Sequence, residues 1–246
     1  MVQVNYIAFS IGLALCFTSC VEKNDDTPPS IETFFEGETL TDSLTVIAGE
    51  GFDLTFNLSD DSGLNTARFF ISKKSDIPQV SCAEPDAFEY LGITDLIGNS
   101  YEYSPEIIFP DSIIGIYDLT IGVYDDEGNF SDKDYILSIE NPYYPIMDSL
   151  NSDNISLQCL VSLIDGDLSF ELNLQASCEA MITEMKTYLY ASEILIESQT
   201  YALGSSLIND EYNFTLPETG QYELRLELTS SQGVSSWAVL EISASS

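Results

Sequence analysis

Two similar stretches of sequence decide the fold: GIYDLTIGVYDDEGNFS at Gly115–Ser131 and GQYELRLELTSSQGVSS at Gly220–Ser236. Each begins Gly-x-Tyr-x-Leu, continues with apolar residues at alternate positions, and reaches a second glycine at the same spacing, Gly128 or Gly233. Alternation with a period of two is typical of a strand with one buried face, and the Asp/Ser/Gly-rich end is typical of a hairpin turn. The repeat therefore predicts two similar units in tandem.

Further strands are expected upstream of each repeat. Apolar residues alternate over 52–58 in the first unit, and a strand is expected at Ala67–Ser72; in the second unit, Leu168–Leu174 and Met185–Ala191 are expected as two separate strands. No stretch shows a sustained helical period with caps. Roughly seven short strands per unit predict an all-β chain of two tandem immunoglobulin-like β-sandwich domains.

The chain divides into a signal peptide, a lipidated tether, a first domain, a linker and a second domain, in that order: residues 1–19, 20–30, 31–140, 141–145 and 146–246. Within the first domain, Ser75–Ser100 contains Pro78 and Pro85 and is expected to be an irregular insertion. Tyr117 and Tyr222 stand near the start of the penultimate strand of each sandwich, the place of a tyrosine corner.

Composition excludes several classes of function. The chain of 246 residues has 41 acidic residues, 7 Lys+Arg and no His, for a formal net charge of −34. Nucleic-acid binding is not expected, because phosphate recognition needs clustered cations. The absence of His excludes a Ser-His-Asp triad and His-ligated zinc. With so many carboxylates, no single acid pair points to catalysis, so we expect a protein that is not an enzyme.

The N-terminal residues predict export and attachment to a membrane. Residues 7–17 form an apolar run that is too short for a transmembrane helix but suits a signal peptide. The run ends in Phe17-Thr18-Ser19-Cys20, which resembles the lipobox of bacterial lipoproteins. That resemblance implies cleavage before Cys20, lipid on its thiol, and membrane attachment through acyl chains.

The first unit resembles an uncharacterised group of Bacteroidetes surface lipoproteins with an immunoglobulin-like domain. The resemblance rests on DDTPPSI at Asp25–Ile31, SDDSGL at Ser59–Leu64 and the run Gly115–Asn129. It implies an outer-membrane lipoprotein displayed at the cell surface, with the acidic, Pro-containing residues after Cys20 acting either as an export signal or as a spacer.

Two acidic turns are candidates for Ca²⁺ binding. Asp60, Asp61, Asp125, Asp126 and Asn129 carry oxygen ligands of the kind that Ca²⁺ prefers, and the two turns belong to the same pole of one sandwich. The same residues are also ordinary turn formers, because an Asp side chain accepts hydrogen bonds from the backbone that follows it. Apart from this Ca²⁺, no cofactor is expected.

Cys159 and Cys178 are candidates for a disulfide in an oxidising compartment. A tight hairpin between their strands would place them too far apart for a bond, unless the first strand crosses to the other sheet. The sequence therefore leaves open a bridge or two core thiols.

The partner is an unknown protein or glycan. Tyr143, Tyr144 and Trp237 are candidates for ligand binding, together with Tyr188 and Tyr190, which share a strand face. We expect a lipid-anchored binding or scaffold module of the cell envelope. The alternative is a glycan-capture accessory lipoprotein of an outer-membrane uptake system, which exposed aromatic side chains on one face would favour.

Overall fold

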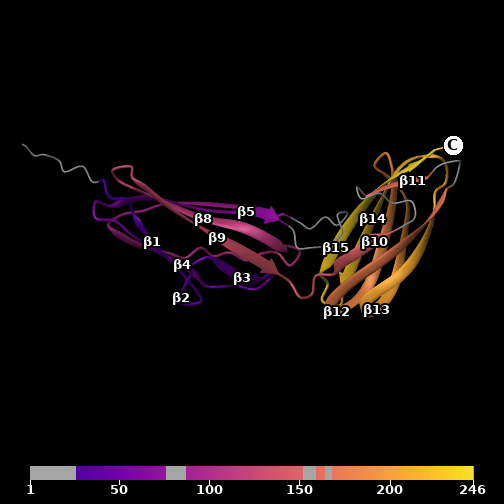
Figure 1. The fold of residues 1–246 in the computed structure, drawn as a ribbon, viewed down its shortest axis with the longest axis horizontal. Coiled ribbons are helices and arrows are strands. Elements are labelled where there is room, and N and C mark those ends of the chain that lie inside the picture. The colour runs from indigo at the N-terminus through magenta and orange to yellow at the C-terminus, as the bar shows by residue number, and fades with distance from the viewer. Residues whose placement is uncertain (1–25, 76–86, 152–158, 164–167, 246) are drawn as a thin grey trace, which may run out of the picture.

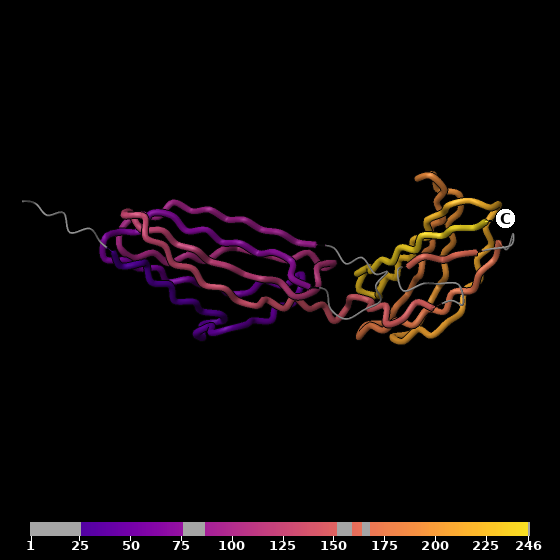
Figure 2. Tube along the Cα trace, turned by 45° about the horizontal axis from the view of Figure 1, so that its top comes forward, coloured from indigo at the N-terminus to yellow at the C-terminus, as the bar shows by residue number. Residues whose placement is uncertain are grey.

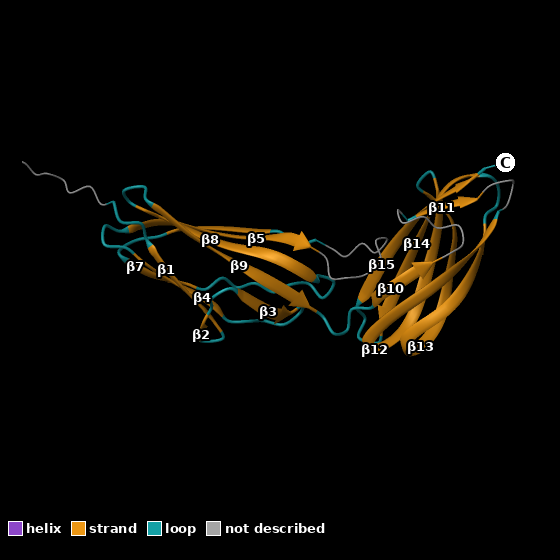
Figure 3. Cartoon of the chain, in the orientation of Figure 1, coloured by secondary structure: helices purple, strands orange, loops and turns teal. Residues whose placement is uncertain are grey.

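The computed structural model describes residues 26–75, 87–151, 159–163 and 168–245, and every regular element within these ranges is a β-strand (Figures 1 and 3). The expectation of an all-β, immunoglobulin-like chain is confirmed. The strands form two units that lie end to end (Figure 2). In the part of the chain that is described, no helix is long and apolar enough to cross a membrane.

The first unit is a sandwich of two sheets. Its strands are β1 (Ser30–Phe35), β2 (Glu38–Thr39), β3 (Ser43–Ile47), β4 (Leu54–Ser59), β5 (Leu64–Ser75), β6 (Tyr90–Asp95), β7 (Ser100–Tyr103), β8 (Gly115–Asp125) and β9 (Phe130–Glu140). One sheet has the order β2-β1-β4-β7 and the other β3-β9-β8-β5-β6. Strand β3 runs parallel to β9, and the other pairs are antiparallel. Alternate residues of both sheets face a shared apolar core that contains Phe56, Phe69 and Phe109.

The strands of the second unit pair into one six-stranded sheet. It consists of β10 (Ile146–Asn151), β11 (Leu160–Leu163), β12 (Ser169–Ala191), β13 (Ile194–Thr215), β14 (Gly220–Ser230) and β15 (Ser235–Ala244). The strand order is β10-β12-β14-β15-β11, and β13 pairs with β12. Strand β11 runs parallel to β15, as β3 runs parallel to β9 in the first unit.

The sequence repeat corresponds to the last hairpin of each unit, β8–β9 and β14–β15. The amide of Asp125 donates to the carbonyl of Asn129 in the first turn, and the amide of Ser230 donates to that of Val234 in the second. Gly128 and Gly233 have φ angles of 88° and 80°, a region that a side chain disfavours. The shared glycine is thus a requirement of the turn.

The expectation of separate strands at Leu168–Leu174 and Met185–Ala191 is wrong, because both belong to the continuous strand β12. The first part of β12 pairs with β10 and the last part with β14. Between these two parts, register shifts near Ile182 interrupt the pairing of β12 with β13 and with β14. Such irregularities bend a strand, and here they separate the part of β12 that pairs with β10 from the part that pairs with β14. Strand β13 follows it along the whole length.

The irregular insertion expected at Ser75–Ser100 contains a strand. Strand β6 forms the edge of the five-stranded sheet and pairs with β5. Its Leu91 and Ile93 are 62% and 61% exposed, whereas Tyr90 is half-buried against the core. Because the apolar side chains of β6 point toward solvent, its pattern does not match that of a strand with one buried apolar face.

Residues 141–145 connect the two units. The side-chain amide of Asn141 donates to the carbonyl of Asp111 over 2.7 Å, and the amide of Glu179 donates to the carbonyl of Pro142 over 3.2 Å. Tyr144 is 2% exposed in a small cluster with Ile114 of the first unit and Val234 of the second. Apolar packing and hydrogen bonds therefore fix the linker to both units.

Candidate functional site

One face of the second unit carries a row of aromatic and charged side chains. In β12, β14 and β15 every second residue, such as Leu189, Leu224 and Ala238, is buried in the core. The residues between them point outward. We call this surface the aromatic face, and it consists of Lys186, Tyr188, Tyr190, Glu223, Arg225, Glu227, Trp237, Val239 and Glu241.

The register of the three strands explains which of these side chains meet. Lys186 lies opposite Glu227, which lies opposite Trp237; Tyr188 lies opposite Arg225. Tyr188 and Trp237 are thus diagonal neighbours across β14. Their rings stack with centroids 6.0 Å apart and planes inclined by 25°. Both side chains are half-buried, so part of each ring stays accessible to solvent.

Charged groups border this aromatic pair. The hydroxyl of Tyr188 donates to Oε2 of Glu227 over 3.1 Å. The guanidinium of Arg225 lies 5.0 Å from the ring centre of Tyr190, within the range of a cation–π contact, and its Nε donates to Glu223. These contacts hold donors and acceptors next to the aromatic rings.

A hollow of about 560 Å³ continues the aromatic face at the Tyr190 end. Its lining combines an aromatic ring, a guanidinium and several carboxylates and polar groups: Tyr190, Ser192, Glu193, Gln221, Tyr222, Glu223, Arg225 and Glu241. Tyr222 is held there by a hydrogen bond from its hydroxyl to the carbonyl of Glu218, over 3.0 Å. This bond is the expected tyrosine corner; Tyr117, the corresponding residue of the first unit, is buried in its core.

The electrostatics of the face follow from these contacts. Burial raises the pKa of Tyr188, and so does its hydrogen bond to the carboxylate of Glu227. The hydrogen bond from Lys186 to Glu184 raises the pKa of the Lys186 ammonium. Both shifts favour the protonated forms, the neutral phenol of Tyr188 and the ammonium of Lys186.

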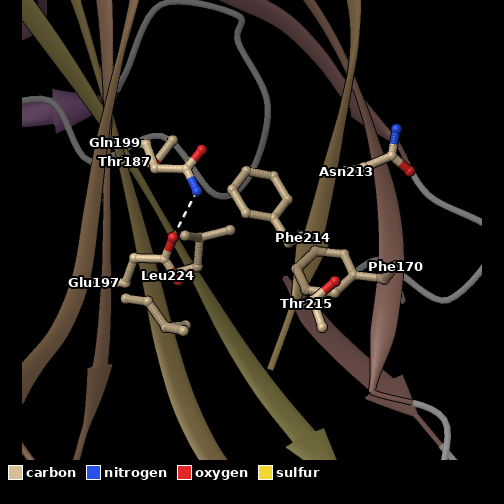
Figure 4. A pocket seen from close by; sticks show the side chains of 9 residues that line it. Phe170, Thr187, Glu197, Gln199, Asn213, Phe214, Thr215 and Leu224 are labelled. Carbon is tan, nitrogen blue, oxygen red and sulfur yellow. Dashed lines mark hydrogen bonds between the residues drawn. The ribbon is translucent and has the colours of Figure 1, made fainter. Parts of the chain in front are cut away.

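A second recess of this unit is lined by residues of β12, β13 and β14 (Figure 4). Its volume is about 150 Å³, and its apolar wall includes the stacked rings of Phe170 and Phe214, whose centroids are 5.3 Å apart. Both ends of β13 contribute to it, through Glu197 and Gln199 on one side and residues 213–215 on the other. The side-chain amide of Gln199 donates to Glu197 over 2.6 Å.

The two acidic turns proposed for Ca²⁺ lie next to each other, as the sequence suggested. The amide of Asp126 donates to the carbonyl of Gly63, and Asn65 donates to the carboxylate of Asp126 over 3.2 Å. Asp60 accepts hydrogen bonds from the backbone of Ser62 and Gly63, and so stabilises its own turn.

Asp125 is 2% exposed and accepts two hydrogen bonds from Asn129, one from its backbone amide and one from its side chain, each 2.7 Å long. Within the described ranges, no three acidic or Cys side chains converge on a point that would hold a metal ion. Turn formation therefore accounts for Asp60, Asp125 and Asn129, and Asp61 and Asp126 stand beside them without completing a cluster. Calcium binding stays a prediction.

The uncertain Cys159–Cys178 disulfide is wrong. Cys178 has a free thiol, while Cys159 takes part in a disulfide that does not involve Cys178. The strand after Cys159, β11, crosses to pair with β15 and does not form a hairpin with β12. Cys178 is half-buried, its thiol donates to the carbonyl of Pro142 over 3.7 Å, and burial raises its pKa.

The aromatic candidates separate into three environments. Trp237 lies on the aromatic face with Tyr188 and Tyr190. Tyr143 is 46% exposed on the linker and is not one of the residues of that face. Tyr144 is wrong as a ligand-binding residue, because it is buried between the two units. Cys20 and its lipobox lie outside the described residues.

Sequence reasoning missed the charged members of the face, Glu223, Arg225 and Glu227. They stand at alternate positions of the sequence repeat, between the apolar residues that face the core. The available signal was therefore that these alternate residues point outward on one face of the strand.

No family model and no curated protein matches the chain. Among solved structures it is similar to Escherichia coli alpha-2-macroglobulin activated by porcine elastase, with a TM-score of 0.43 and 9% identity over 89% of this chain and 22% of that one. It is also similar to dimeric latent PorU from Porphyromonas gingivalis, with a TM-score of 0.35 and 13% identity over 93% of this chain and 21% of that one. For red sea bream transglutaminase the TM-score is 0.33, with 8% identity over 89% of this chain and 32% of that one. The chain thus spans about a fifth to a third of these proteins' length, and we base no functional argument on them.

Proposed function

We propose that this chain is a non-enzymatic, lipid-anchored protein of the outer membrane that binds a neutral glycan chain at the cell surface through the aromatic face. The lipid on Cys20 provides the attachment, and the second sandwich provides the binding surface. The observation that carries the proposal is the stacked pair of Tyr188 and Trp237, bordered by Arg225 and carboxylates.

The shape and chemistry of the face suit a sugar chain. The C–H bonds on one side of a pyranose ring carry partial positive charge, and they are attracted to the electron-rich face of an aromatic ring. Sugar hydroxyls both donate and accept, so the carboxylates and the guanidinium beside the rings offer charge-assisted hydrogen bonds. The hollow at Tyr190 extends the surface and gives room for a further sugar unit.

The sign of the charge favours a neutral ligand. Glu223, Glu227 and Glu241 lie on the face, and the whole chain carries a formal charge of −34. An anionic polysaccharide would meet like charges in the binding surface, and such juxtapositions cost several kcal/mol.

Trp237 provides a direct test, because the chain contains a single Trp. Titrating the protein with neutral oligosaccharides, such as cello-, xylo-, manno- and malto-oligosaccharides, should change the indole fluorescence for one class in a saturable way. Tyr190→Ala should weaken that binding by about tenfold, the equivalent of one good contact of about 1.4 kcal/mol.

Tyr143→Ala is the matched control, since it removes an exposed aromatic side chain outside the face. It should leave the titration unchanged. If none of the neutral glycans, including insoluble ones in a pull-down assay, binds the wild-type protein, the glycan proposal is wrong. If an acidic polysaccharide binds in their place, the choice of a neutral ligand is wrong.

A further inference from the structure

The second unit has a long free sheet edge. Strand β13 runs from Ile194 to Thr215, and among the described residues β12 is the only strand that pairs with it. Most of its side chains are exposed. Along its outer side, the N–H and C=O groups that do not face β12 have no strand partner among the described residues, so they offer a template for another strand.

This edge lacks two of the residue types that most often protect an exposed edge. Proteins commonly blunt exposed edges with Lys or Pro, yet β13 contains no Lys, Arg or Pro. It also exposes apolar side chains: Ile194 (70%), Leu195 (48%), Ile196 (45%) and Leu207 (65%). An edge of this kind is a template for strand addition.

The charge of the edge indicates the partner. The ionisable groups of β13 other than Tyr201 and Tyr212 are the acids Glu197, Asp210 and Glu211, and Glu193 lies in the turn before it. A second copy of this chain, with its own formal charge of −34, would be repelled. A basic segment would be attracted.

The recess lined by β12, β13 and β14 adds a specific contact. Glu197 and Gln199 at one end of β13 and Phe214 near the other line the same recess (Figure 4). The stem of a Lys or Arg side chain can cover the Phe170–Phe214 rings while its charged head meets Glu197. An added strand would place such a side chain at every second position.

We propose that β13 binds an extended, basic segment of a partner protein by strand addition, with one basic side chain in the recess. This surface is separate from the aromatic face, which lies on β12, β14 and β15. Backbone hydrogen bonds supply affinity, and the recess and the carboxylates supply specificity.

The test uses the full chain and a fluorescein-labelled decapeptide of alternating Lys and Val. Its binding is followed by fluorescence anisotropy and by hydrogen–deuterium exchange. We expect saturable binding and slower exchange within residues 194–215. The same peptide, N-methylated at its four central residues, keeps its side chains but loses backbone donors, and should bind about tenfold more weakly or worse.

Glu197→Gln should also weaken the Lys–Val peptide several-fold, whereas Glu38→Gln, at an exposed position of the first unit, should not. Equal binding of the parent and N-methylated peptides would overturn strand addition. So would protection confined to residues outside β13, equal binding of a Glu–Val peptide, or a dimer of the chain that forms through β13 without peptide.

Discussion

The rings of Tyr188 and Trp237 stack on each other across β14, the strand between the two strands that carry them. Tyr188 lies on β12 and Trp237 on β15, and their ring centres are 6.0 Å apart over the residues of β14. The stack links three strands, so it contributes both to the stability of the sheet and to the surface that we propose for binding.

Removing the stack should destabilise the second unit modestly. Aromatic pairs contribute about 0.5–1.5 kcal/mol beyond their buried area, so Tyr188→Ala and Trp237→Ala should each lower the free energy of unfolding by about 1–2 kcal/mol. The double variant should lose less than the sum, because both single changes remove the same contact. Urea denaturation of the four proteins measures this coupling. Strict additivity would show that the stack contributes nothing.

High pH should destabilise the second unit through Tyr212. Burial and the negative charge of Asp210 raise the pKa of Tyr212 to about 12 from the ordinary value of 10.0. The folded state holds this proton more tightly than the unfolded state, so the stabilisation is complete below pH 10 and is lost as the pH rises toward 12. The loss is of the order of 2–3 kcal/mol.

Urea midpoints measured from pH 8 to pH 12 would detect this loss, with phenolate absorbance as a second readout. Tyr212→Phe should flatten part of the decline, although the raised pKa values of Tyr188 and Tyr201 in the same unit leave some of it in place. If the urea midpoints of Tyr212→Phe fell with pH as those of the wild-type protein do, ionisation of Tyr212 would not be a cause of the loss of stability.

The two described cysteines should differ in reactivity. Cys178 carries a free thiol and should be alkylated by iodoacetamide without a reductant, whereas disulfide-bonded Cys159 should be alkylated only after reduction. Burial raises the pKa of Cys178, so less thiolate is present at pH 8 and its alkylation should be slow and faster at higher pH. Mass spectrometry of the alkylated peptides distinguishes the two. Alkylation of Cys159 without reductant would refute this assignment.

The sequence predicted the local features of the fold well. The Gly-x-Tyr repeat indicated β8 and β14 because both the alternation and the glycine turn are contained within one short segment. It did not predict that β12 is continuous. Alternation on its own does not distinguish one bent strand from two separate strands. Residues 175–183 contain no Gly, Pro, Asn or Asp, and this absence of turn residues was the available signal that the strand continues.

The candidate site was only partly predictable for a related reason. A period of two shows that Tyr188 and Tyr190 share a face, but it does not show which residue of another strand lies beside them. The neighbour, Trp237, is set by the register of β14 against both strands. Tyr144 was misjudged because a linker between prolines gives no sign of the apolar contacts on either side.

The turn at Asp125 should be more sensitive to substitution than the adjacent acidic residue. Asp125→Ala removes the acceptor of two hydrogen bonds from Asn129 in a buried position, which should cost about 1–3 kcal/mol. Asp126→Ala, whose side chain is exposed and accepts one hydrogen bond from Asn65, should cost less than about 1 kcal/mol.

Thermal melts in Ca²⁺ and in EDTA would test the predicted Ca²⁺ site on the same samples. A higher melting temperature in Ca²⁺ that is lost in Asp126→Ala would support it, and coincident wild-type curves would contradict it.

Membrane attachment should depend on one atom, the sulfur of Cys20. In a cell of the type that processes lipoproteins, Cys20→Ser should abolish incorporation of a labelled fatty acid and release the protein from the membrane fraction, because each buried methylene contributes about 0.8 kcal/mol and two or three acyl chains hold the protein firmly. The sandwiches begin at Ser30, outside the lipidation motif, so the released protein should keep the wild-type melting temperature and fluorescence. Cys178→Ser serves as the matched control and should stay lipidated. If Cys20→Ser still incorporates fatty acid, the anchor lies elsewhere, whereas a released but unfolded product would show that the tether contributes to the fold.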